Sequence, residues 1–145
     1  MKRFGVLLPA LLLLAGAPQP SVGADAGVRV IVNPQVKGNM ISRAALTQIF
    51  LKQAPRYADG VTAQPVDQSV KSPVRTAFSS RVLGQAILEV QVYWHRKMSQ
   101  GVTPPPVRTS DEDVVAFVAQ TPGAIGYVSS AVALPDSVRA IEVAN

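Results

Sequence analysis

The sequence contains no cysteine and one histidine, and both shortages narrow the chemistry open to it. Without cysteine the chain forms no disulfide, has no thiol nucleophile and binds no metal through sulfur. His95 follows Trp94 and precedes two cations on an amphipathic stretch, and the sequence offers no orienting partner of the kind that a general base needs. We therefore expect a protein that is not an enzyme and that uses no catalytic residue, metal or cofactor.

Clusters of charged residues are also scarce in the sequence. The one acidic run, Asp111 to Asp113, follows Ser110 at the start of an amphipathic segment, where carboxylates complement a helix dipole, so we interpret it as a helix start and not as a metal site. No Lys/Arg cluster with interleaved aromatic residues is present, which argues against nucleic acid as a partner. The 14 basic and 9 acidic residues become 12 and 9 without Lys2 and Arg3, a net charge of +3 that is compatible with small anions.

The longest hydrophobic run stands at the N-terminus. Lys2 and Arg3 precede an apolar stretch over 4–17, and small residues at 22–24 fit a cleavage site. This pattern predicts a signal peptide over 1–24 and a single domain over 25–145, exported to the periplasm with no membrane span after signal cleavage. The alternative is an uncleaved membrane anchor, for which the apolar run is short.

Strand and helix signals alternate along the rest of the chain. Branched residues predict strands at 29–33, 64–66, 124–128 and 138–143, and Pro65 places the second of these at a sheet edge. Ser42, Ser72 and Ser110 predict helix starts, and a further helix follows Gly84 with an apolar stripe that runs to Met98. We expect an α/β domain of two or three layers, with a small mixed sheet of about four or five strands flanked by helices. Its core should contain Phe50, Phe78, Trp94, Phe117 and Ile125.

The stretch "DQSVKSPVRTAF", residues 67–78, is the best candidate site. Ser72 and Pro73 predict a helix start, and Arg75 then lies in the first turn, where the helix dipole prefers negative charge. A bound oxyanion would account for this cation, so we predict that Asp67, Ser69, Ser72 and Arg75 bind a ligand. In the alternative, Ser72 is only a cap and Arg75 is a solvated side chain that pairs with Asp67.

Five segments occur in an order that resembles a known family: "VIVNP", "ISRAALTQIFLKQAPRYADG", "QPVDQSVKSPVRTAF", "YWHRKMSQGVTPP" and "TPGAIGYV". They are similar to small periplasmic proteins related to the phosphate-binding component of phosphate ABC transporters. The resemblance implies the type II periplasmic-binding-protein fold, of which this chain is long enough for a single lobe. The glycine-serine-glycine-threonine turn that grips phosphate in full-length members is absent from residues 67–78.

The resemblance implies a periplasmic solute-binding module for phosphate or a similar oxyanion, in phosphate uptake or sensing. The alternative is a module that has lost ligand binding and docks a protein through the face of the missing lobe. That partner would be a membrane transporter, a sensor protein or a second copy. We expect the docking face to comprise residues 33–34, 67–72 and 101–106.

Overall fold

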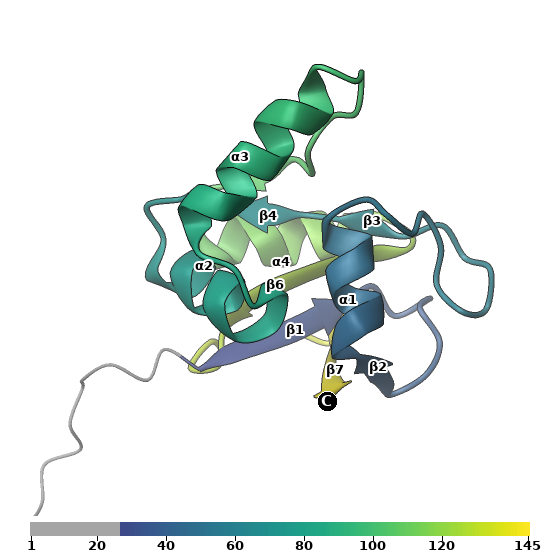
Figure 1. The fold of residues 1–145 in the computed structure, drawn as a ribbon. Coiled ribbons are helices and arrows are strands. Elements are labelled where there is room, and N and C mark those ends of the chain that lie inside the picture. Colours follow the sequence, from purple (N-terminus) through teal and green to yellow (C-terminus); the bar gives the residue numbers. More distant parts are fainter. Residues whose placement is uncertain (1–26) are drawn as a thin grey trace, which may run out of the picture.

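A computed structural model describes residues 27–145, so the predicted signal peptide lies outside the described residues. Strand β1 (Val28–Val32) forms the centre of a five-stranded sheet with the order β2-β7-β1-β6-β3 (Figure 1). The other strands are β2 (Met40–Ser42), β3 (Gln64–Pro65), β6 (Ala124–Ser129) and β7 (Arg139–Ala144). β1 runs antiparallel to β6 and β7, whereas β2 is parallel to β7 and β3 is parallel to β6. The predicted mixed sheet is confirmed, and so is the edge position of the strand that contains Pro65.

Helices cover both faces of this sheet, which makes the domain three-layered. Successive side chains of a strand point to opposite faces: Val30 and Val32 of β1 pack into one cluster, and Ile31 packs into another with Val114 and Val118. The first cluster lies under α1, α2 and α3, and the second lies under α4 (Figure 1). The bounds are Arg43–Phe50 for α1, Pro73–Phe78 for α2, Ile87–Met98 for α3 and Asp111–Gln120 for α4.

The predicted core is largely confirmed. Phe50, Phe78, Trp94 and Ile125 are buried. Phe117 is half-buried at the edge of the second cluster, with the Arg108 guanidinium 4.9 Å from its ring centroid.

The apolar stripe of α3 does not reach as far as the sequence predicts. Val90 and Trp94 are buried, but Met98 is 51% exposed. The reason is geometric, because the end of α3 projects beyond the rest of the fold (Figure 1). Among the residues that the structure describes, no helix combines the length and hydrophobicity needed to cross a membrane.

Gly126 on β6 allows α4 to pack closely against the sheet. A Cβ atom at this position would lie 2.8 Å from Val114 Cγ1 and 2.8 Å from Val66 Cγ1. A larger residue would push α4 away from the sheet, and α4 carries one wall of the candidate site.

Three short strands, β2 among them, and one π-helical turn were not predicted. β4 (Asp67–Gln68) and β5 (Val107–Arg108) form a separate two-stranded parallel sheet. A π-helical turn, η1 (Ser79–Leu83), continues α2 and ends at Gly84, whose φ is 66°. Gly84 thus separates two helical segments, as predicted, and its left-handed conformation suits glycine.

Candidate functional site

The stretch that the sequence singles out begins where the chain leaves the main sheet. Val66 N still donates to Ile125 O of β6, whereas Asp67 N donates to Pro106 O next to β5. From here β4 runs parallel to β5, and parallel strands end at the same edge. The helices that follow these two strands, α2 and α4, therefore begin close together.

Ser72 caps α2, as predicted. Its backbone is extended (φ −74°, ψ 129°), its Oγ accepts from Arg75 N at 3.4 Å, and Pro73 occupies the first turn. Both features are usual at a helix start, because the cap satisfies one backbone donor and proline has none to lose. The same cap arrangement recurs at α4, where Ser110 Oγ accepts from Asp113 N at 3.1 Å.

Arg75 points into the protein and not toward solvent. The residue is 3% exposed, and its Nε lies 3.2 Å from Asp67 Oδ1. The carboxylate of Asp67 therefore supplies, from within the chain, the negative charge that the start of α2 favours. The alternative to a bound oxyanion, in which a solvated Arg75 pairs with Asp67, is observed in its pairing, but Arg75 is buried and not solvated.

Tyr127 of β6 completes this buried cluster. Its hydroxyl donates a short hydrogen bond to Asp67 Oδ1, and Gln68 N donates to the same oxygen at 2.8 Å. The Tyr127 ring stacks on Phe78, with centroids 3.8 Å apart and planes 4° from parallel. One carboxylate oxygen thus ties β4, β6 and α2 together, which fixes the start of α2 relative to the sheet.

The charges of this cluster are strongly desolvated. Burial raises the pKa of Asp67 above its usual value, although Arg75, the Tyr127 hydroxyl and Gln68 N pull the pKa in the opposite direction. Burial and the Asp67 charge both raise the pKa of Tyr127, so its hydroxyl remains a donor at neutral pH.

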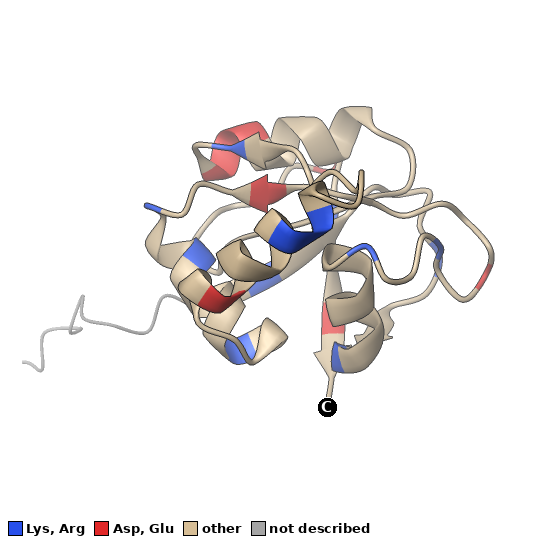
Figure 2. Ribbon diagram, turned by 45° about the horizontal axis from the view of Figure 1, so that its top comes forward, with Lys and Arg blue, Asp and Glu red and all other residues tan. Residues whose placement is uncertain are grey.

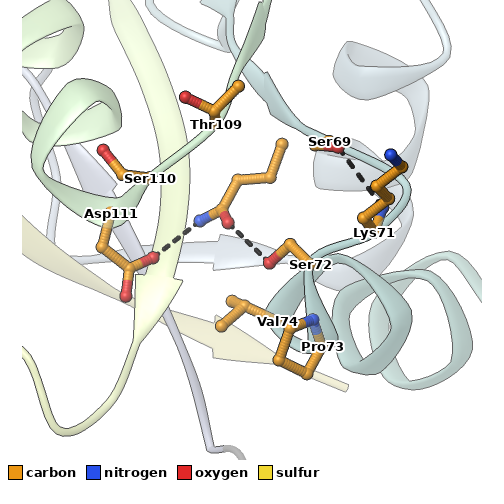
Figure 3. A pocket seen from close by; sticks show the side chains of 9 residues that line it. Ser69, Lys71, Ser72, Pro73, Val74, Thr109, Ser110 and Asp111 are labelled. Carbon is orange, nitrogen blue, oxygen red and sulfur yellow. Dashed lines mark hydrogen bonds between the residues drawn. The ribbon is translucent and has the colours of Figure 1, made fainter.

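A hollow of about 520 Å³ lies between the starts of α2 and α4 (Figure 3). Hydroxyl groups dominate its polar lining, with one cation and one carboxylate. The lining residues are Gln68, Ser69, Lys71, Ser72, Pro73, Val74, Thr109, Ser110 and Asp111.

Gln68 bridges the two sides of this hollow. Its Nε2 donates to Asp111 Oδ1 at 2.8 Å and to Tyr127 O at 2.9 Å, and its Oε1 accepts from Ser72 Oγ at 2.8 Å. The dashed lines in Figure 3 mark the bonds that end on Asp111 and Ser72. The Ser72 proton is therefore directed at Gln68, and Ser72 can donate to a ligand only after its hydroxyl rotates.

The charges around the hollow are mixed. Figure 2 shows the acidic first turn of α4 beside a basic position on β5. Asp111 accepts from Gln68 Nε2 and, at 3.3 Å, from Ser129 N, which partly offsets its charge. Lys71 is exposed on the opposite side. An anion would therefore be attracted to the Lys71 side, close to Ser69 and Ser72.

The four residues predicted from the sequence separate into two groups. Ser69 and Ser72 line the hollow, whereas Asp67 and Arg75 form the buried ion pair beneath it. Contact between Arg75 and an anion would require this pair to open. That the four residues bind a ligand stays a prediction.

Sequence reasoning missed Gln68, Tyr127 and the α4 side of the hollow. Residues 124–128 indicated only a strand, and Ser110 only a helix start. A usable signal was nevertheless present, because Ser72 and Ser110 each begin a helix shortly after a polar extended segment. Parallel pairing of those two segments brings both serines to one edge.

No protein-family model matches the sequence, and no curated protein matches it. Solved structures do match. An ABC-type phosphate transport receptor from Vibrio cholerae is 20% identical, with a TM-score of 0.63, over 81% of this chain and 46% of the receptor. A Clostridium perfringens protein with bound phosphate, assigned as a phosphate ABC transporter substrate-binding protein, is 19% identical, with a TM-score of 0.61, over 81% of this chain and 44% of that protein. PstS from Borrelia burgdorferi is 14% identical, with a TM-score of 0.60, over 80% and 46%.

These similarities concern the fold, and each extends over less than half of the matched protein. The resemblance that the sequence segments indicate is thereby confirmed at the level of structure. The chain has the α/β fold of a single lobe of the phosphate ABC transporter substrate-binding proteins.

Proposed function

We propose that this chain is an exported, non-enzymatic solute-binding module that binds phosphate or a similar oxyanion in phosphate uptake or sensing. The observation that carries the proposal is the hollow between the starts of α2 and α4, on a fold shared with phosphate receptors. Its Lys71 ammonium and the Ser69 and Ser110 hydroxyls offer hydrogen-bond donors to a tetrahedral anion. The Asp67–Arg75 pair serves as the buried support for this surface.

Binding by a single lobe should be weak. A single lobe has no second lobe to close over the hollow, so a bound anion stays partly hydrated and meets few donors. We expect clear saturation only at high phosphate concentration.

The experiment is a calorimetric titration with phosphate, sulfate and acetate, run beside a melting curve for each anion. Phosphate should raise the melting temperature, since a ligand that binds only the native state stabilises it. Lys71→Ala should weaken binding, whereas Arg96→Ala, which removes an equal charge from the exposed face of α3, should not. If no anion moves the melting curve and none produces heat, the proposal is wrong.

A second candidate function rests on two exposed apolar side chains near the hollow. Val70 follows β4 and is 47% exposed, and Val107 on β5 is 52% exposed. They support a module that docks a transporter component, a sensor protein or a second copy through this face. Asn33 does not contribute to that face, because it is 5% exposed and its side chain donates to Val118 O.

Val70→Glu and Val107→Glu test this alternative. Each should disrupt a complex cross-linked in cells, whereas Leu88→Glu, at an apolar position on α3 that is 69% exposed, should leave it intact. A complex that survives both changes would exclude docking through this face.

A further inference from the structure

A second hollow lies on another side of the fold, between α1 and the loop over residues 54–59. Its volume is about 580 Å³, which falls in the range of pockets that bind small molecules. The residues that line it are Val36, Lys37, Gly38, Met40, Ile41, Ser42, Ala45, Gln48, Ile49, Ala54, Arg56, Tyr57, Ala58, Asp59 and Ile141. None of them lines the hollow at α2 and α4. We call this second hollow the α1 groove.

The floor of the α1 groove is apolar and belongs to the main core. Val36, Ile49 and Ile141 are at most 7% exposed and form part of the cluster beneath α1. Met40 stands at the rim and is 58% exposed. Methionine is flexible and polarisable and adapts to varied apolar ligands, so an exposed methionine beside an apolar floor suits a binding site.

Hydrogen bonds hold both walls in place. On one wall, Glu142 N of β7 donates to Asn39 O at 2.9 Å. On the other, the Tyr57 hydroxyl donates to Gly123 O at 2.9 Å, and Tyr57 N donates to Val61 O at 2.9 Å. The groove is therefore formed before any ligand arrives, and a ligand need not bear the cost of ordering these loops.

The charges around the groove favour an anionic group. Lys37 and Arg56 line it together with a single acidic residue, Asp59. Asp59 Oδ1 accepts from Val61 N at 3.1 Å, so part of the acidic charge is engaged by the backbone, and one Arg56 nitrogen, Nη1, is likewise engaged by Gly60 O. The net charge of the lining is +1, counted from Lys37 and Arg56 against Asp59.

We propose that the α1 groove binds an amphiphilic anion, with an aliphatic body on the Val36–Ile49–Ile141 floor and a carboxylate between Lys37 and Arg56. Apolar burial supplies most of the binding free energy, and the two cations select the charged head group. This site shares no lining residue with the oxyanion site, so one proposal can be wrong while the other is right.

The test is a calorimetric titration of the purified protein with decanoate below its micelle concentration, beside decan-1-ol and inorganic phosphate. Decanoate should bind one to one and raise the melting temperature. Decan-1-ol should bind about tenfold more weakly, because it lacks the charge that Lys37 and Arg56 recognise. Phosphate, which has no apolar body, should not compete with decanoate.

Two variants locate the binding. Ala45→Trp fills the groove from α1 and should abolish decanoate binding, and Lys37→Glu combined with Arg56→Glu should weaken it while leaving decan-1-ol unaffected. Arg96→Ala, which removes an exposed cation that lines neither hollow, is the control and should leave decanoate binding unchanged. If Ala45→Trp does not fold, the double charge reversal still tests whether decanoate binds in the α1 groove. Decanoate that does not bind, that binds at many sites with a falling melting temperature, or that ignores the charge reversal would overturn the proposal.

Discussion

Replacing Arg75 with methionine tests whether its buried ion pair holds the candidate site in place. The change keeps an apolar stem and removes the guanidinium, so Asp67 remains as a carboxylate whose side chain is 12% exposed. Breaking a buried pair by removing one partner costs about 3–5 kcal/mol. Because a typical domain is stable by about 5–15 kcal/mol, the variant should still fold, but with much of its stability lost.

The pH dependence makes this prediction specific. Asp67 already has a raised pKa, caused mainly by burial, and losing Arg75 removes an interaction that lowers it. A carboxyl whose pKa is higher in the folded state than in the unfolded state favours folding below the unfolded pKa, about 3.9, and that stability is lost as the pH rises through the folded pKa. The cost of Arg75→Met should therefore be small near pH 4 and should grow toward neutral pH.

Urea unfolding provides the assay, because Trp94 is the one tryptophan and is buried, so its fluorescence should report the transition. Adding Asp67→Asn to Arg75→Met should recover stability at neutral pH, since no buried charge remains. Arg75 Nη1, a buried donor with no hydrogen-bond partner among residues 27–145, favours such recovery, because its own burial is costly. Arg96→Met on the surface should change stability by less than about 0.5 kcal/mol.

The reasoning is refuted if Arg75→Met costs under about 1 kcal/mol, or if its cost is the same at pH 4 and at neutral pH. If the loss of stability caused by Arg75→Met does not change with pH, Arg75 contributes through the packing of its stem and not through its charge.

Three further predictions concern the core and the backbone. Trp94→Ala should cost about 3–5 kcal/mol in urea unfolding followed by circular dichroism, because the side chain is buried, and a cost under about 1 kcal/mol would contradict that burial. Tyr127→Phe keeps the ring stack and removes the donor to Asp67, so it should cost about 1–3 kcal/mol, and an unchanged midpoint would mean that this hydrogen bond adds nothing. Gly123→Ala places a Cβ atom 2.2 Å from Thr62 O at a φ of +76°, and should lower the melting temperature far more than Gly38→Ala, which has a φ of +82° and open space; equal effects would refute the clash.

Local signals in the sequence account for most of the fold. The cap serines at 42, 72 and 110 begin helices where predicted, because a serine side chain satisfies a backbone donor within its own turn. The long strands were also found, since a run of branched residues needs no distant information to be recognised. β4 and β5, two residues each, carry no such pattern and exist because they pair with each other.

The site was predicted less completely, for a physical reason. The direction of Arg75 depends on Asp67 and on Tyr127, which lies 60 positions after Asp67 and carries no sign of its role in the sequence around it. The helix dipole predicts that negative charge is favoured at the start of α2, but it does not indicate which residue supplies that charge. Similarly, the wall at Ser110 appears only once β4 and β5 are paired.

The arrangement of the central strand has a consequence for the timing of folding. β1 lies at the beginning of the domain, yet both of its neighbours, β6 and β7, lie at the end, and the Arg29 guanidinium reaches Ser130 O across 101 positions. Contacts between such distant segments form slowly, because a long loop must close before they stabilise anything. A chain that emerges from its N-terminus therefore cannot complete the sheet until its last strand is available. Removing β7 should leave β1 with an open edge that other chains can pair with, so truncated protein should aggregate.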